Sequence, residues 1–199
     1  MVTEVGTKTI DMTQNWDYSW KEIVEQHTPK RLLVDLDGCV VEYNFPLLVK
    51  KFFGVDISKM QIYAYDLADV LGVTPALIDR MFREQVFGKP NFIDGALETL
   101  QEWAGKYEII IFSNRVKYMG YEGLMDWLID NHIPFNGIDG GQGEYDVHID
   151  DRPAKLMETN SKVKLLFNQP WNRGCHNITG KLKRVFTWRE IEKEVENIE

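Results

Sequence analysis

The chain has 199 residues, which is long enough for one domain with an insertion and too short for two full domains. Hydrophobic residues make up 44% and charged residues 27%, values that are typical of a soluble globular protein and exclude a disordered one. The formal net charge of −8 argues against binding of a nucleic-acid polymer, which requires a basic surface, but it leaves a small anionic substrate possible.

The two cysteines, Cys39 and Cys175, are too few for a disulfide scaffold and indicate a reducing compartment. No apolar run approaches the length that is needed to cross a membrane, and the N-terminus lacks the apolar core of a signal peptide. We therefore expect a cytoplasmic protein without a membrane partner. The sequence leaves open whether this protein is a monomer or a homodimer.

Residues 1–28 form a polar N-terminal extension that contains several aromatic side chains. A short helix that packs on the main domain and a partly ordered leader are both compatible with this pattern. Residues 32–34 then form an apolar run, which predicts a short strand buried on both faces.

Two carboxylates follow this first strand directly, in the sequence Asp35-Leu36-Asp37-Gly38. Alternation along an extended chain points Asp35 and Asp37 the same way, and ligands of open α/β sheets collect at the carboxyl ends of the strands. Two like charges so close are costly unless a cation or a shared proton separates them. The pattern therefore indicates a divalent metal site, or a carboxylate nucleophile beside a proton-transferring partner. A turn in which Asp and Gly serve only the backbone geometry is the alternative.

Residues 40–92 show helical periodicity and little that is typical of strands. Apolar residues recur at helical spacing over residues 45–53, and Gly54 ends the pattern. The pair Thr74-Pro75 suits an N-cap and a first helical position, which predicts a further helix over residues 76–87. Small helices directly after the first strand suggest a cap over the site. Its aromatic residues could hold a flat ligand or form the core of the cap: Tyr43, Phe45, Tyr63, Tyr65 and Phe92.

From residue 94 onward strands and helices alternate, which predicts right-handed crossovers and a mostly parallel sheet. Apolar patterning places the expected helices over residues 96–104, over residues 121–131 and from residue 188 onward. The expected strands cover residues 107–112, 146–149, 163–167 and 184–186. His148, within one of these strands, is interpreted as a structural residue.

Polar side chains follow three of the expected strands. They are Asp35 and Asp37 after the first strand, Ser113-Asn114-Arg115 after residues 107–112, and Asp150-Asp151 after residues 146–149. Each group alone is common in turns and helix caps, but their order along the chain is specific. This order of Asp-x-Asp-Gly, Ser-Asn and Asp-Asp, within residues 31 to about 190, resembles that of the haloacid dehalogenase (HAD) superfamily of phosphohydrolases.

The finer resemblance is to the 5′(3′)-deoxyribonucleotidase-like branch of that superfamily. The segments that resemble motifs of this branch are residues 88–96, 149–153, 167–173 and 187–189. The resemblance implies an α/β fold, a HAD-like Rossmannoid three-layer parallel sheet with a small helical cap inserted after the first strand. It also implies a core domain made of residues 29–42 and 93–199, and a cap made of residues 43–92.

The resemblance further implies a role for each polar group. Asp35 would attack phosphorus and become a phosphoaspartate, while Asp37 would protonate the leaving alcohol and then deprotonate the attacking water. Mg²⁺ would sit on Asp35, the backbone carbonyl of Asp37, and Asp150, with Asp151 orienting a metal-bound water or the neighbouring loop. Ser113 and the backbone N–H of Asn114 would bind the non-transferred phosphate oxygens. The expected substrate-binding residues are Ser113, Asn114, Arg115 and Lys117.

The chain departs from the superfamily pattern at the lysine that normally neutralises the nucleophile and the phosphate. The two positions at which this lysine is expected hold Leu124 and Gln142. Each candidate replacement could instead be a solvated surface charge. The candidates are Lys117, which is preferred because it closely follows Ser-Asn, and Arg115, Lys155 and Arg152.

Three functions are compatible with these observations. The leading interpretation is a Mg²⁺-dependent phosphomonoesterase that acts on a small phosphorylated metabolite, above all a nucleoside monophosphate of the deoxyribose type. The second is a phosphatase of another small phosphometabolite, such as a sugar or glycolate phosphate. The missing lysine motivates the third, a non-catalytic module that binds phosphate or a nucleotide.

Overall fold

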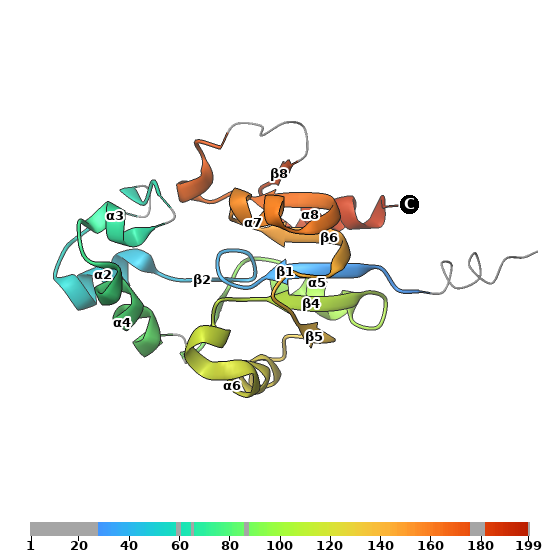
Figure 1. Ribbon diagram of the computed structural model, residues 1–199, viewed down its shortest axis with the longest axis horizontal. Coiled ribbons are helices and arrows are strands. Elements are labelled where there is room, and N and C mark those ends of the chain that lie inside the picture. Colours follow the sequence, from blue (N-terminus) through green and yellow to red (C-terminus); the bar gives the residue numbers. More distant parts are fainter. Residues whose placement is uncertain (1–27, 59–60, 65, 86–87, 176–181, 199) are drawn as a thin grey trace, which may run out of the picture.

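The computed structural model describes residues 28–58, 61–64, 66–85, 88–175 and 182–198 (Figure 1). The N-terminal extension expected over residues 1–28 therefore lies outside the described residues, except for Thr28. Within the described parts of the chain, no helix is both long and apolar enough to cross a membrane.

A six-stranded parallel sheet has the strand order β5-β4-β1-β6-β7-β8. Its strands are β1 (Arg31–Asp35), β4 (Glu108–Phe112), β5 (Gly137–Ile138), β6 (Glu144–Asp150), β7 (Asn160–Phe167) and β8 (Lys183–Val185). In the interior, Val34 of β1 lies opposite Ile111 on one side and Ile149 on the other. The carboxyl ends of these three strands, including Asp35 and Asp150, therefore meet at one edge of the sheet. The predicted parallel α/β fold is confirmed.

Alternate residues of the central strands pack into different apolar clusters, as the pleat of a strand requires. Leu32 and Val34 belong to the larger cluster, which also contains residues of three helices. Leu33 belongs to a smaller cluster with residues of β4 and β6. The flanking helices are α5 (Ala96–Trp103), α6 (Val116–Asp130), α7 (Pro153–Glu158) and α8 (Trp188–Glu196), and all of these except α7 contribute to the larger cluster.

Three short helices lie beyond the carboxyl end of the sheet (Figure 1). They are α2 (Phe45–Phe53), α3 (Leu67–Leu71) and α4 (Pro75–Gln85), which we call the cap. The cap has an apolar cluster of its own, built around Leu48, Val49 and Met81. The chain enters and leaves it through an antiparallel pair of two-residue strands, β2 (Val41–Glu42) and β3 (Asn91–Phe92). The domain boundaries at residues 43 and 92 stay a prediction.

Local capping sets the bounds of the cap helices. The Asn44 side chain accepts a hydrogen bond from the backbone N–H of Leu47 (3.2 Å), and Gly54, at a φ of 68°, ends helix α2. The Asp66 side chain caps α3 in the same way, 2.9 Å from the backbone nitrogen of Ala68. Helix α4 begins with Pro75 at its first position, because a proline lacks only an N–H that is unpaired there in any case.

Several elements differ from the sequence prediction. Helix α6 begins at Val116 rather than at residue 121, and Gly120 (φ 73°) kinks it after its first turn, so its apolar periodicity starts late. Helix α7, strand β5 and the β2–β3 pair are absent from the prediction. Two-residue strands are too short to show an alternating pattern, and a six-residue helix scarcely shows a helical one.

Candidate active site

Three buried carboxylates meet where strands β1 and β6 end. Asp35 closes β1, Asp150 closes β6, and Asp151 follows directly; at most 3% of any of them is exposed. One oxygen from each side chain can be chosen so that all three lie within 4.8 Å of one another. The cluster brings together three of the four residues predicted for the metal site.

The electrostatics of this cluster favour a cation. Burial, and then the charges of Asp150 and Asp151, raise the pKa of Asp35 well above its usual range. Burial and the charge of Asp150 likewise raise the pKa of Asp151. Within the described residues, no hydrogen bond reaches Asp150 Oδ2 or Asp151 Oδ1. Because buried carboxylate oxygens that lack donors are typical ligands of hard cations, the three residues fit a divalent ion such as Mg²⁺.

The raised pKa values predict how stability changes with pH when metal is absent. The folded state then binds protons that the unfolded chain releases above pH of about 4, so the free energy of unfolding falls as pH rises. In EDTA, urea unfolding should show lower stability at about pH 8 than at about pH 5, and Mg²⁺ should restore more stability at the higher pH. Asp35→Asn should flatten this slope, whereas an unchanged slope in that variant would contradict the assignment to the cluster.

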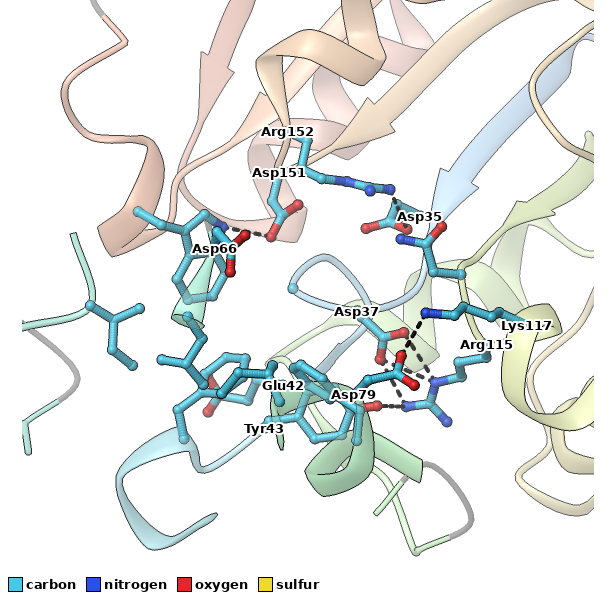
Figure 2. A pocket seen from close by; sticks show the side chains of 18 of the residues that line it. Asp35, Asp37, Glu42, Tyr43, Asp66, Asp79, Arg115, Lys117, Asp151 and Arg152 are labelled. Carbon is cyan, nitrogen blue, oxygen red and sulfur yellow. Dashed lines mark hydrogen bonds and ion pairs between the residues drawn. The ribbon is translucent and has the colours of Figure 1, made fainter. Parts of the chain in front are cut away.

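The side chain of Asp37 turns away from the cluster toward Arg115 (Figure 2). Arg115 Nε lies 3.1 Å from both carboxylate oxygens, and Nη2 donates to Oδ1 at 2.9 Å and to the Tyr43 hydroxyl at 3.0 Å. The guanidinium also stacks over Trp127, 4.0 Å from the ring centroid. Arg115, a predicted substrate-binding residue, is 3% exposed and lines the cavity while it pairs with Asp37.

Lys117 pairs with the cap. Its ammonium lies 2.5 Å from Asp79 Oδ1 of helix α4, and the Tyr118 hydroxyl donates to the same oxygen at 2.9 Å. These hydrogen bonds, with that of Lys117 the largest, lower the pKa of Asp79 to about 2. Lys117 is the preferred candidate to replace the missing lysine, and it lines the cavity. Its ammonium is nevertheless paired with Asp79, in an ion pair that joins the cap to the core.

Arg152 approaches the predicted nucleophile (Figure 2). Its Nη2 lies 3.9 Å from Asp35 Oδ1, and its Nε lies 3.5 Å from Asp150 Oδ1. The guanidinium packs over Phe112, 5.6 Å from the ring centroid, and 11% of the side chain is exposed. The other positions considered for the missing lysine have different surroundings. Lys155 pairs with Glu158, Leu124 is buried in the core, and Gln142 is exposed.

Ser113 and Asn114 follow β4 at the same edge of the sheet. Ser113 is buried, and its Oγ accepts a hydrogen bond from the backbone N–H of Arg115 at 3.2 Å. Asn114 lines the cavity beside Asp35 and Asp37. The structure therefore brings all the sequence-predicted strand-end residues to one region, although only Asp35, Asp150 and Asp151 share the carboxylate cluster.

A cavity of about 380 Å³ opens between this edge and the cap. Its aromatic lining consists of Tyr43, Phe45, Tyr118, Phe82 and Trp171. Phe45 connects the set, with ring centroids 5.7 Å from Tyr43 and from Trp171. Trp171 also donates from Nε1 to Asp151 Oδ2 at 2.9 Å, so one wall of the cavity is joined to the carboxylate cluster.

The aromatic residues singled out from the sequence lie in three kinds of surroundings. Tyr43 and Phe45 line the cavity, whereas Phe92 packs on the core and Tyr63 is 69% exposed. Tyr65 lies outside the described residues. Phe82 also lines the cavity, and the sequence does not indicate this. Periodicity places Phe82 on one face of a helix, but nothing in the local pattern shows which face meets the cavity.

His148 lies behind Asp150 and is completely buried. Its Nδ1 lies 2.7 Å from Thr159 Oγ1, and its Nε2 lies 3.4 Å from Asp150 Oδ2. His148 and Asp150 are two residues apart on β6 and so point to the same face of the sheet. Its burial fits the interpretation as a structural residue, and its position beside Asp150 helps to hold that carboxylate in place.

Gly38 allows the loop after β1 to pass close to Asp151. It has a φ of 95°, and a Cβ atom there would lie 2.2 Å from Asp151 Oδ2. Gly38→Ala should therefore cost about 1–2 kcal/mol of backbone strain and also displace a carboxylate of the cluster. Gly54→Ala is the matched control, because Gly54 has a φ of 68° but a Cβ atom there would meet no described atom within 4 Å. Urea unfolding should show a larger loss for Gly38→Ala, and equal losses would contradict this account.

Solved structures of known proteins share this fold at low sequence identity. The haloacid dehalogenase-like hydrolase SP0104 from Streptococcus pneumoniae is 13% identical, with a TM-score of 0.58 over 84% of this chain and 98% of that one. YfnB from Bacillus subtilis, assigned as a HAD hydrolase and bound to magnesium, is 12% identical, with a TM-score of 0.54 over 86% and 100%. The fold is thus that of the HAD hydrolases. Comparison with curated proteins gave no match.

Residues 30–197 match the family described as 5′ nucleotidase, deoxy (pyrimidine), cytosolic type C protein. The match covers nearly the whole described chain, so the protein belongs to this family. It is therefore a phosphatase of the HAD superfamily, as its sequence predicts.

Proposed function

We propose that this protein is a Mg²⁺-dependent phosphomonoesterase that works through a phosphoaspartate at Asp35 and acts on a deoxyribonucleoside monophosphate. The observation that carries the proposal is the cluster of Asp35, Asp150 and Asp151, with Arg152 beside it, at one end of an aromatic-lined cavity. The family match supports the reaction class and the kind of substrate.

In the proposed reaction, Asp35 and Asp37 act in two half-reactions. In the first, an oxygen of Asp35 forms a bond to phosphorus while the bond between phosphorus and the alcohol oxygen breaks, and Asp37 gives that oxygen a proton. In the second, a water oxygen forms a bond to phosphorus while the bond between phosphorus and the Asp35 oxygen breaks, and the water gives a proton to Asp37. This step releases phosphate and restores the Asp35 carboxylate. The substrate alcohol and phosphate are the only products.

A magnesium ion would be held by Asp35, Asp150, Asp151 and the backbone carbonyl of Asp37, and would supply positive charge against the carboxylates and the phosphate. Arg152 takes the place of the missing lysine, because its guanidinium lies beside both Asp35 and Asp150. Ser113 Oγ and the backbone N–H of Asn114 bind the non-transferred phosphate oxygens.

The cavity favours a flat substrate with one phosphate. Phe45, Phe82 and Trp171 offer apolar ring surfaces on which a base can stack. The cavity lining also carries the carboxylates of Glu42 and Asp66, which disfavour a second phosphate and suit hydrogen-bond donors of a base or sugar. The same carboxylates would suit sugar hydroxyls, so a sugar phosphatase is the second candidate.

Phosphate release from a panel of substrates tests the proposal. The panel contains deoxyribonucleoside and ribonucleoside monophosphates, sugar phosphates and phosphoglycolate, each with Mg²⁺ and with EDTA. Metal-dependent release concentrated on deoxyribonucleotides is the expected result. Preference for sugar phosphates would favour the second candidate, and no release from any compound by folded protein would refute the proposed function.

A further inference from the structure

The carboxylate of Asp37 is held by a buried arginine, Arg115, for which the sequence predicts a contact with substrate or the role of the missing lysine. Arg115 approaches Asp37 through two nitrogens, with Nε 3.1 Å from each oxygen and Nη2 2.9 Å from Oδ1. Charge-assisted contacts that engage both oxygens fix the plane of a carboxylate, which a single hydrogen bond does not do. The Asp37 side chain remains 28% exposed, so it is accessible from the cavity.

Arg115 is itself fixed from two sides. Trp127 of helix α6 lies under the guanidinium, 4.0 Å from its Cζ atom to the ring centroid, and the arginine side chain is 3% exposed. The hydroxyl of Tyr43, a residue that packs on the apolar cluster of the cap, accepts a hydrogen bond from Nη2 at 3.0 Å. A planar guanidinium with so little freedom is suited to orienting Asp37, because its side chain loses little further conformational entropy when the two residues pair.

We propose that Arg115 is a positioning residue that acts through Asp37 and does not bind the substrate phosphate. The inference rests on the proposed function, in which Asp37 transfers protons to and from oxygen atoms at phosphorus. Proton transfer requires the carboxyl oxygen within hydrogen-bond reach of the reacting oxygen, and displacement by about 1 Å can cost about 10²-fold in rate. Arg115 thus links the cap, through Tyr43, to the proton-transferring carboxylate.

This role predicts a distinct kinetic signature. Arg115→Gln should lower kcat by about 10- to 100-fold, because Asp37 is no longer held in place. KM should change by less than about threefold, because no contact with the phosphate is lost. With 4-nitrophenyl phosphate, the rate of the 4-nitrophenol burst should fall less than kcat, since only the first half-reaction of an activated ester proceeds without acid catalysis.

A double-mutant cycle separates positioning from direct binding. Arg115→Gln, Asp37→Asn and the double variant are assayed on the best substrate of the panel, and inhibition by inorganic phosphate is measured for each. If Arg115 acts through Asp37, the double variant should be no slower than Asp37→Asn alone. Lys155→Gln is the charge-matched control, since Lys155 pairs with Glu158 outside the cavity lining, and it should keep wild-type kinetics.

Two outcomes would overturn the inference. One is a loss of kcat in the double variant that equals the product of the two single losses. The other is an increase above about tenfold in KM and in the phosphate inhibition constant of Arg115→Gln, with kcat retained. If Arg115→Gln does not fold by circular dichroism, Arg115→Lys is used, and it should keep part of the wild-type kcat with KM unaltered. Inactivity of wild-type protein on the whole panel would overturn the proposed function itself, whereas multiplied losses in an active enzyme overturn only the role of Arg115.

Discussion

Asp35→Asn is expected to reduce phosphate release by at least about 10⁴-fold, because an amide cannot form the covalent intermediate and the remaining groups only bind and orient the ester. Release of phosphate from the best substrate of the panel, in Mg²⁺, measures this loss. The substitution adds no bulk, so the variant should fold normally.

Stability in EDTA provides the control for this prediction. Asp35 is buried next to two other carboxylates, so removal of its charge should leave the free energy of unfolding unchanged or higher near neutral pH. Turnover near the wild-type rate in the folded variant would contradict the role of Asp35 as nucleophile. A strongly destabilised variant would contradict the electrostatic account of the cluster.

Arg152→Ala is expected to lower kcat/KM by about 10²- to 10³-fold, because a preorganised charge beside the nucleophile and the transferring phosphate is lost. Steady-state kinetics on the same substrate measure the effect, and Arg152→Lys should recover part of it. Inhibition by inorganic phosphate should weaken in parallel.

Lys117→Ala is the matched comparison, since Lys117 also lines the cavity with a positive charge but is joined to Asp79 of the cap. Its removal should reduce kcat/KM by less than about tenfold. An effect of Lys117→Ala as large as that of Arg152→Ala would return the role of the missing lysine to Lys117. It would show that the Lys117–Asp79 contact is replaced when substrate binds.

The strand ends are predictable because their signals are local. An apolar run followed by Asp35, Ser113 or Asp150 identifies a buried strand and the polar residue after it, and parallel pairing then brings such residues to one edge. The helical cap is predictable for the same reason, from capping residues and helical spacing. The fold class therefore follows from the sequence together with the resemblance to a family.

The pairing of the cations is not predictable in this way. Lys117 is close to Ser113 in sequence, yet its partner Asp79 lies 38 residues away on the cap, and no local pattern shows that contact. Arg115 and Asp37 are 78 residues apart, and their pairing depends on how β4 lies beside β1. The tertiary structure determines which partner a long charged side chain meets. Residue type and spacing therefore indicate the candidate cations but not the ion pairs that they form.

The most direct test of the account is to trap the phosphoaspartate. Asp37→Asn protein is mixed with 4-nitrophenyl phosphate and Mg²⁺, because this ester leaves without acid while the hydrolysis step lacks its base. The reaction is quenched in acid, reduced with borohydride and analysed by peptide mass spectrometry. We expect a burst of 4-nitrophenol and homoserine in place of Asp35, with no homoserine when substrate is omitted. A burst with position 35 unmodified, or with another residue reduced, would contradict it.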